Sequence, residues 1–396
     1  MTEEWVIAAM TTSSHSPKGV APPTILQVLP ALGGGGVERG TLEIADYLSR
    51  IGWTSLVASE GGKMLEQLEK SGSEHFSLPL ASKNPWVMRR NIDRLVKIIK
   101  ENKVDIVHAR SRAPAWSAYF AAKKAKVRFV TTVHGIYGFG PFGIKKAYNR
   151  IMLKGDLIIS VSEFVSRLIQ REYSVPEEKI RVVHRGVDLD TFAPDKVSKE
   201  RIDAIRNEWQ LPAGKTVIMM PCRLSRWKGH HLLLDAVNML KNKDDIVCVF
   251  VGAMDSRSNY KKEILKYATK QGLKQNVKIF SYTGDMAAAY MLADIVVSAA
   301  TKPEAFGRTI IEAEAMGRLV IAADEGGACE TVKDGLTGLL FKSRDAEDLA
   351  DNLERIFEMS NREKEVMRET AQSCASAEFS TNAMCAKTVK VYEELL

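Results

Sequence analysis

Short apolar runs that suit buried β-strands alternate with segments of helical periodicity along almost the whole of this chain. In the first half the runs cover residues 24–32, 54–59, 75–80, 105–110, 129–134, 157–162 and 180–187. In the second half they cover residues 216–222, 246–252, 277–282, 294–300, 319–323 and 338–341. Segments between them, such as 36–51, 229–241 and 345–358, carry apolar residues at helical spacing. This alternation predicts parallel sheets with right-handed crossovers.

The length of 396 residues is too great for one ordinary core, so we expect two doubly wound α/β domains. The boundary is predicted after Gly186-Val187-Asp188, because residues 189–215 are polar, contain proline and lack strand character. The expected parts are a disordered tail over 1–23, an N-terminal domain over 24–188, a C-terminal domain over 189–375 and a final segment over 376–396. That segment holds a last helix, at about 376–394, which either caps its own domain or crosses back to the first one.

The composition excludes several classes of protein. Hydrophobic residues make up 45% and charged residues 27% of the chain, which is typical of a soluble globular protein. The five cysteines are scattered and form no C-x-x-C pair or Cys/His cluster, so neither a zinc site nor a disulfide framework is indicated. No secretory signal and no apolar run long enough to span a bilayer is evident. We therefore expect a reducing, cytoplasmic location.

The net charge of +7 is concentrated in the first half of the chain. Residues 1–190 hold 27 Lys and Arg against 19 Asp and Glu, a balance of +8. Such an excess can serve a nucleic acid, an anionic membrane surface or a phosphorylated substrate. No nucleic-acid-binding signature accompanies it. Ordinary solvated helix faces explain the charge at least as well as any one of these partners.

Glu304 and Glu312 lie on either side of a predicted helix start. The run 294–300 reads as a buried strand, and a loop with Gly307 then opens a helix predicted over 308–316. The backbone N–H groups at such a helix start can bind an anion, while the two carboxylates can bind hydroxyl groups. Taken alone, the pair is explained better by the preference of acidic residues for the positive end of a helix.

A run of four glycines follows the first predicted strand and opens the helix that begins at Val37. Gly33, Gly34, Gly35 and Gly36 allow the backbone to approach a phosphate closely. The run is neither G-x-G-x-x-G nor a P-loop, which argues against dinucleotide and Walker-type readings. A phosphate-proximal loop and a merely flexible connection both remain open.

Two cations, Arg223 and Lys228, follow the first predicted strand of the second half, just before a helix at Gly229. Ligands of doubly wound sheets bind at the carboxyl ends of the strands. Cations at this position can bind a diphosphate and stabilise the charge that develops on it as it leaves.

His134 and Gly135 end the fifth run of the first half, and a glycine–aromatic loop with Tyr137 follows. A glycine–aromatic loop of this kind can cover an acceptor. For His134 itself, a structural role is the commoner one for a lone histidine. The next helix combines apolar residues with Lys145 and Lys146, so it can rest on an anionic membrane surface or simply pack with a solvated basic face.

The Asp188-x-Asp190 sequence has the spacing of a metal-binding motif but stands at the domain boundary. We expect it to form a turn and to bind no metal.

Taken in order, these motifs resemble those of the retaining glycosyltransferases of the GT-B fold, in glycosyltransferase family 4. The resemblance covers nearly everything from Thr24 to Leu396. Its most specific element is the pair Glu304 and Glu312, which matches the E-x7-E motif of that family. The Thr-x-His-Gly turn at His134, the Gly186-Val187-Asp188 sequence and the segment from Gly326 to Glu330 join it in the family's order.

The resemblance implies two Rossmann-like domains that face each other across a cleft. The acceptor would bind to residues 24–188 and a UDP- or GDP-sugar to residues 189–375. Glu312 would bind the ribose and Glu304 the transferred sugar, while Arg223 and Lys228 would bind the diphosphate. The implied donor-binding residues are Gly34, Gly35, Gly36, Arg223, Lys228, Tyr282, Glu304, Phe306, Gly307, Arg308, Thr309, Ile310 and Glu312. The implied catalytic residues are His134, Glu304, Arg223 and Lys228, and the implied acceptor contacts are His134, Gly135 and Tyr137.

The implied reaction is front-face displacement with retention, in which the leaving diphosphate helps to remove the acceptor's proton. No metal and no other cofactor are implied. The sequence looks most like bacterial envelope-polysaccharide transferases of lipopolysaccharide or capsule assembly. Such an enzyme would act on a glycan or lipid-linked saccharide, and it could make peripheral contact with the cytoplasmic face of the inner membrane. No nucleic-acid partner is implied. Three departures from the family pattern, at Cys222, Arg185 and residues 299–301, bear on the identity of the donor.

Other functions stay open from the sequence. A nucleotide-sugar epimerase shares the architecture, and a non-catalytic nucleotide-sugar-binding protein could retain the motifs. A dehydrogenase is suggested by the glycine run alone. The donor base and sugar, the acceptor and linkage, and the oligomeric state are not specified by these residues.

Overall fold

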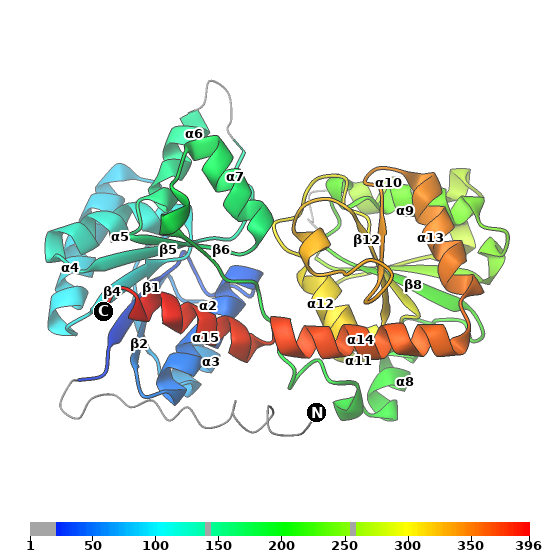
Figure 1. Cartoon of the computed structure of the whole chain (residues 1–396), viewed down its shortest axis with the longest axis horizontal. Helices are drawn as coiled ribbons and strands as arrows, with labels where there is room; N and C mark the ends of the chain where they lie inside the picture. Colours follow the sequence, from blue (N-terminus) through cyan, green and yellow to red (C-terminus); the bar gives the residue numbers. More distant parts are fainter. Residues whose placement is uncertain (1–20, 139–143, 254–258) are drawn as a thin grey trace. The chain divides into compact units, whose positions relative to one another are not determined.

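The computed structural model describes residues 21–138, 144–253 and 259–396, and the chain divides into two compact units (Figure 1). Unit 1 comprises the chain up to Ile159 together with Glu178–Arg181 and Thr388–Leu396. Unit 2 comprises Ser160–Glu177 and Val182–Lys387. Each is built on a parallel sheet with helices around it, as the alternating sequence pattern predicts.

The first sheet has seven strands in the order β3-β2-β1-β4-β5-β6-β7. The strands are β1 Thr24–Val28, β2 Thr54–Ser59, β3 Glu74–Ser77, β4 Ile106–Ala109, β5 Arg128–Val133, β6 Leu157–Ser160 and β7 Ile180–Val182. The second sheet has six strands in the order β10-β9-β8-β11-β12-β13. Its strands are β8 Thr216–Pro221, β9 Ile246–Val251, β10 Val277–Phe280, β11 Ile295–Ser298, β12 Leu319–Ala323 and β13 Leu339–Phe341.

Both sheets reverse their strand order at an inner strand. β1 pairs with β2 on one side and β4 on the other, and β8 pairs with β9 and β11 in the same manner. At such a reversal the connections leave in opposite directions, so the carboxyl ends of the two strands border a natural binding crevice. The loops after β8 and β11 are therefore the first place to look for a site in unit 2.

Helices follow the strands through most of the chain. The α-helices are α2 Gly36–Arg50, α3 Leu65–Lys70, α4 Pro85–Glu101, α5 Arg112–Ala125, α6 Ile144–Asn149, α7 Glu163–Tyr173, α8 Lys199–Glu208, α9 His230–Met239, α10 Tyr260–Lys270, α11 Met286–Met291, α12 Arg308–Ala315, α13 Ala346–Glu358, α14 Asn361–Phe379 and α15 Thr381–Glu393. The 3-10 helices are η2 Arg150–Leu153, η3 Glu177–Lys179, η4 Pro194–Lys196, η5 Arg226–Lys228, η6 Lys243–Asp245, η7 Lys274–Asn276 and η8 Gly327–Glu330.

The central strands are buried on both faces, which explains why they read as unbroken apolar runs. Every residue of β9 is buried, and the side chains of its Cys248 and Phe250 pack into the main core of unit 2 with residues of α9, α10 and α13. Each Å² of apolar surface that is buried contributes about 25 cal/mol to the free energy of folding, so these packed layers are the main source of stability. They hold the loops at the strand ends in fixed positions.

The helix predicted over 376–394 is divided in the structure. α14 ends at Phe379, and Ser380 has φ −67° and ψ 150°, which is extended rather than helical backbone. α15 then begins at Thr381 and its end belongs to unit 1, where the Tyr392 hydroxyl lies 2.7 Å from Nδ1 of His108.

The Gly186-Val187-Asp188 sequence pairs with the break between these two helices. The Val187 amide donates to the Phe379 carbonyl oxygen at 2.7 Å, and the Thr381 amide donates to the Val187 carbonyl oxygen at 2.9 Å. A Cβ atom at Gly186 would lie 2.6 Å from Cα of Thr381, so only glycine fits. Asp188 forms the predicted turn, because its Oδ1 accepts from the amide of Asp190 at 2.9 Å.

Candidate active site

The loop that carries Glu304 follows β11 and is fixed by two glycines of a neighbouring loop. Gly326 forms a parallel bridge with Glu304, and the Gly327 amide donates to the Glu304 carbonyl oxygen at 2.7 Å. A Cβ atom at Gly326 would lie 2.5 Å from that same oxygen, and Gly326 also has a φ of +79°. Glycine is therefore needed here, both for the close approach and for the backbone conformation.

Lys228 and Glu304 meet at the carboxyl ends of β8 and β11. Nζ of Lys228 lies 2.8 Å from Oε1 of Glu304, and the two side chains are only 14% and 17% exposed. The Ser298 hydroxyl, at the end of β11, donates to the same carboxylate oxygen at 3.4 Å. Because the pair is largely removed from water, it is held more strongly than a surface ion pair. A largely sheltered cation and a largely sheltered carboxylate thus stand together at the reversal of strand order.

The backbone of η5 holds Lys228 in this position. The Trp227 carbonyl oxygen accepts a hydrogen bond from the Thr301 amide at 2.7 Å. Gly229 has a φ of +83°, and a Cβ atom there would lie 1.7 Å from the Ala299 carbonyl oxygen. The short 3-10 turn after β8 is therefore packed directly onto the loop after β11.

Arg223 follows β8 and is exposed to solvent, in contrast to Lys228. Its neighbour Cys222, which stands where the resembling family usually has glycine, is half-buried with its Sγ 3.5 Å from Nε2 of His230. Burial raises the pKa of the Cys222 thiol to about 12, even though Lys228 and Arg223 act in the opposite direction. At neutral pH this thiol is protonated and is a small packing group beside the two cations.

The start of α12 fits the predicted anion site. Gly307 is its N-cap residue and makes no side-chain capping hydrogen bond. The Ile310 amide donates to the Gly307 carbonyl oxygen at 3.0 Å, so among the predicted contacts it is less suited to a ligand than the amides of Arg308 and Thr309. The aligned N–H groups and dipole of this helix favour a phosphate group at its start.

Glu312 lies one turn further along α12 and is oriented by a residue that the sequence does not single out. The Tyr290 hydroxyl, from α11, donates to Oε2 of Glu312 at 2.9 Å. Arg308 lies on the other side, with its Nε 3.8 Å from Oε1. The carboxylate is 12% exposed, so it is sheltered but within reach of a ligand.

The remaining donor-site predictions fall on different surroundings. The Phe306 side chain is 8% exposed and packs against the rings of His184 and Phe379, with centroids 5.8 and 6.0 Å away. Any contact of Phe306 with a ligand would therefore be made by its backbone, and the donor-binding role of Phe306 stays a prediction. Tyr282 follows β10 and is 57% exposed, so a planar base could stack on its ring, and its donor-binding role stays a prediction.

The glycine run of unit 1 is open to solvent at the start of α2. Gly34 has a φ of +118° with no atom within 4 Å of an added Cβ, whereas a Cβ at Gly35 would meet the Glu38 carboxylate at 2.5 Å. Gly36 is the first residue of the helix, and Gly35 caps it without a side-chain hydrogen bond. The predicted close approach of a phosphate is thus sterically allowed at Gly34, and its occurrence stays a prediction.

The predicted acceptor contacts also lie in unit 1. His134 and Gly135 follow β5 directly and are half-buried. The Arg112 guanidinium lies over the Tyr137 ring, 4.4 Å from its centroid. The glycine–aromatic loop continues into residues 139–143, which lie outside the described residues. The acceptor role of His134, Gly135 and Tyr137 stays a prediction.

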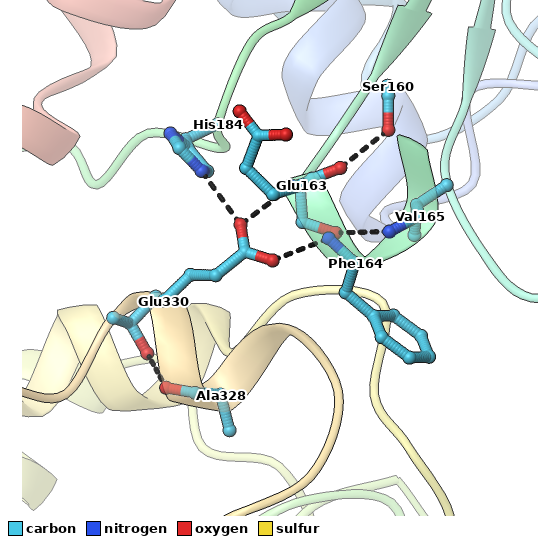
Figure 2. A network of polar contacts seen from close by, with 9 residues as sticks. Ser160, Glu163, Phe164, Val165, His184, Ala328 and Glu330 are labelled. Atoms are coloured by element: carbon cyan, nitrogen blue, oxygen red, sulfur yellow. Dashed lines mark hydrogen bonds and ion pairs between the residues drawn. The ribbon is translucent and has the colours of Figure 1, made fainter. Parts of the chain in front are cut away.

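Glu330, the last residue of the segment from Gly326 to Glu330, accepts hydrogen bonds from the first backbone amides of α7 (Figure 2). Its Oε2 accepts from the amide of Glu163 at 2.7 Å and its Oε1 accepts from the amide of Phe164 at 2.6 Å. His184 lies 3.0 Å from Oε2. Burial acts to raise the pKa of Glu330, but the hydrogen bonds from His184 and from the two amides outweigh it, so the pKa lies below its ordinary value.

We expect Glu330→Gln to lower the free energy of unfolding of unit 2 by about 1.5–3 kcal/mol near neutral pH, the usual value of hydrogen bonds to a charged group. Because the folded-state pKa is depressed, the wild-type advantage is present above the ordinary value of 4.5 and is lost as the pH falls through the folded-state pKa. Urea unfolding followed between pH 7 and 3 measures it. Glu378→Gln, which removes an exposed carboxylate 2.6 Å from Lys333, is the control and should cost less than about 1 kcal/mol. A pH-independent difference for Glu330→Gln would contradict this account.

Comparison with known proteins identifies the family. The model described as Glycosyltransferase Family 4 matches residues 34–191, and the model described as Glycosyl transferases group 1 matches residues 201–373. The crystal structure of a glycosyltransferase from Rickettsia africae is 39% identical, covers 95% of this chain and 99% of its own, and superimposes with a TM-score of 0.87. The chain belongs to the glycosyltransferases.

Two further relatives extend this comparison. The structure of HepE from Anabaena in complex with UDP and glucose is 23% identical, with a TM-score of 0.80 over 94% of this chain and 100% of its own. The N,N'-diacetylbacillosaminyl-diphospho-undecaprenol alpha-1,3-N-acetylgalactosaminyltransferase of Campylobacter jejuni is 23% identical over 81% of this chain and 85% of its own. The two parallel-sheet units of this glycosyltransferase are Rossmann-like and of the GT-B type, which confirms the fold predicted from the sequence.

Over residues 21–138, 144–253 and 259–396, no helix combines the length and apolar character that a membrane span requires. Over the same residues, no group of three or more His, Cys, Asp or Glu side chains is arranged to hold a metal ion. Tyr290 and Glu330 are the site residues that sequence reasoning missed. In the sequence, the only signal for Tyr290 is a single aromatic residue in the run Ala287-Ala288-Ala289-Tyr290, and Glu330 stands out only as the last residue of the motif segment that begins at Gly326.

Proposed function

We propose that this glycosyltransferase moves a sugar from a nucleotide-diphosphate sugar, with UDP or GDP as the carrier, to a glycan or lipid-linked acceptor, with retention of configuration. The observation that carries the proposal is the sheltered pair of Lys228 and Glu304 at the strand reversal, next to the helix that presents Glu312. A cation for a phosphate and two carboxylates for hydroxyl groups are the groups that such a donor requires.

The Lys228–Glu304 pair suggests how the donor is received. On binding, the diphosphate takes the place of Glu304 as the partner of Lys228, and the Glu304 carboxylate turns to hydroxyl groups of the sugar. Arg223 and the start of α12 bind the remaining phosphate oxygens. This exchange keeps Lys228 paired with an anion, and the Glu304 carboxylate exchanges its cation for hydrogen bonds from the sugar hydroxyl groups.

In the proposed reaction the bond from the sugar to the diphosphate breaks as the acceptor oxygen attacks the same face. Lys228 and Arg223 stabilise the negative charge on the leaving diphosphate, and a phosphate oxygen takes the proton of the acceptor hydroxyl. His134 and Tyr137 are proposed to contact the acceptor. We propose that the two cations perform the charge neutralisation without a metal ion.

Two relatives support the choice of substrates. HepE was crystallised with UDP and glucose, which fits a nucleotide-sugar donor. The Campylobacter transferase is named for a diphospho-undecaprenol acceptor, which fits a lipid-linked acceptor and a step in envelope-polysaccharide assembly, such as lipopolysaccharide or capsule. The basic residues Lys145 and Lys146 of α6, with Arg150 and Lys154 after it, support a peripheral contact with the anionic cytoplasmic face of the inner membrane.

A thermal-shift panel of UDP-, GDP- and ADP-sugars tests the proposed function. A ligand at a hundred times its dissociation constant stabilises the folded state by about 2.7 kcal/mol. For a unit of this size that corresponds to an increase in Tm of roughly 5–10 °C. We expect one of the UDP- or GDP-sugars to produce it, with ADP-sugars as controls. No shift with any member at millimolar concentration would contradict the proposal.

Incubation of the selected donor separates the remaining alternatives. An epimerase would isomerise the sugar of the donor when no acceptor is present. A non-catalytic binding protein would bind the donor but release no nucleoside diphosphate with any acceptor. The proposed transferase releases nucleoside diphosphate and transfers the sugar to the acceptor with its anomeric configuration retained.

A further inference from the structure

The Tyr290 hydroxyl is the group that orients the Glu312 carboxylate. The oxygen lies 2.9 Å from Oε2 of Glu312 and 3.2 Å from the Thr309 carbonyl oxygen, so its single proton has two acceptors within reach. The carboxylate is nearer and charged, which makes it the stronger acceptor. Burial raises the pKa of Tyr290, and the nearby Glu312 charge raises it further, so the hydroxyl remains a donor at all physiological pH values.

Packing leaves this hydroxyl little freedom to move. The Tyr290 side chain has no exposed surface, and Ala287, Ala288 and Ala289 of the same helix α11 are buried with it. The edge of the Phe192 ring meets the Tyr290 ring at a centroid distance of 5.9 Å. A hydrogen-bond donor on a fully buried ring is a fixed point for the more exposed Glu312 side chain.

The two oxygens of Glu312 therefore have different surroundings. Oε2 is held by Tyr290, while Oε1 has the Arg308 guanidinium at 3.8 Å, beyond a normal hydrogen-bond distance. A glutamate on a helix has three rotatable bonds, and holding one oxygen sets the plane of the carboxylate before the ligand arrives. The hydrogen bond from Tyr290 therefore restricts the orientation of the Glu312 carboxylate before a ligand binds.

We propose that Tyr290 is a positioning residue for ribose recognition, acting through Glu312. This inference rests on the proposed function, in which Glu312 binds the ribose hydroxyls. It predicts that the Tyr290 hydroxyl contributes to the discrimination between a ribose and a ribose without hydroxyls, and to nothing else in donor binding.

Titration calorimetry with UDP and with 2′,3′-dideoxy-UDP tests the proposal, with the GDP pair in their place if the panel selects guanine. The wild type should prefer the ribose form by about 10- to 100-fold, as expected for hydrogen bonds to a charged group. Tyr290→Phe should reduce this preference by about 2- to 10-fold, the value of one hydrogen bond, while the Kd of the dideoxy form changes less than about twofold. Tyr267→Phe, which removes a tyrosine hydroxyl 2.6 Å from the Asp235 carboxylate, is the matched control and should change neither.

The outcomes separate this inference from the function on which it rests. Glu312→Ala should abolish the preference, and if it does not, the ribose role of Glu312 fails whatever Tyr290 does. If Glu312→Ala abolishes the preference and Tyr290→Phe retains all of it, the positioning role is overturned. A Tyr290→Phe protein that loses both ligands equally, including by failing to fold, would also overturn it, because Tyr290 would then be only structural.

Discussion

Replacing Lys228 by methionine is expected to lower kcat by about 10²- to 10³-fold, the usual effect of removing one group that stabilises charge developing in a transition state. Lys228 is the sheltered cation at the proposed diphosphate site, and methionine keeps most of its length without the charge. The change also leaves the Glu304 carboxylate buried without its partner at 2.8 Å. Release of nucleoside diphosphate from the selected donor, with and without acceptor, measures the loss.

Arg226→Met is the matched control for Lys228→Met. Arg226 lies on the same 3-10 helix, but its side chain is 72% exposed and pairs with Glu263 instead of the proposed site. Its replacement should leave kcat within about twofold, since exposed ion pairs contribute little. Equal effects of the two substitutions, or an unchanged kcat in Lys228→Met, would remove Lys228 from the reaction.

Replacing Glu312 by alanine should raise the Kd of the selected nucleotide sugar by about 10- to 100-fold, since hydrogen bonds to a charged group are worth about 1.5–3 kcal/mol. The carboxylate is 12% exposed and is already oriented by Tyr290, so little ordering is required when the ribose binds. The effect should appear equally with the nucleoside diphosphate alone, because the ribose is present in both. Titration calorimetry measures both values.

Glu347→Ala is the control for Glu312→Ala, because Glu347 is an exposed carboxylate in the first turn of α13. It should leave the Kd unchanged. A Glu312→Ala protein that binds the nucleotide sugar as tightly as the wild type would disprove the assignment of Glu312 to the ribose.

The sequence predicts the strands well because burial is periodic and local. It overestimates their length where apolar residues are buried for another reason. The run 24–32 contains β1 only as far as Val28, yet Leu29 and Leu32 are also fully buried, packed under α3 in a smaller core cluster. An apolar residue indicates that a position is buried, not that its backbone is extended, so the ends of the apolar runs do not mark the ends of the strands.

The meeting of Lys228 with Glu304 follows from topology, although the two are far apart in sequence. Once β8 and β11 are neighbours in a parallel sheet, the residues just after them must share an edge. Strand order in a doubly wound fold is regular, so the sequence is enough to predict that Lys228 and Glu304 lie near each other. It is not enough to predict the ion pair between them.

Tyr290 and Glu330 could not be predicted because their contacts depend on tertiary packing between helices. The Tyr290 hydroxyl reaches a residue 22 positions away, and Glu330 reaches the start of α7 166 positions away. Neither contact leaves a periodic signal in the chain. The break at Ser380 between α14 and α15 likewise depends on a distant partner, because Ser380 pairs with Val187. Local helix propensity gives no sign of this pairing, so the sequence predicts one continuous helix across the break.

Lys228, Glu304 and Glu312 are proposed to form one nucleotide-sugar site. Titration of the nucleotide sugar selected by the thermal-shift panel into the wild type and into the double variant Lys228→Met, Glu312→Ala tests it most directly. We expect a measurable Kd for the wild type and an affinity lower by at least about 100-fold in the double variant, since two contacts of charged side chains with the ligand are removed. Binding of the same affinity to both proteins would contradict it.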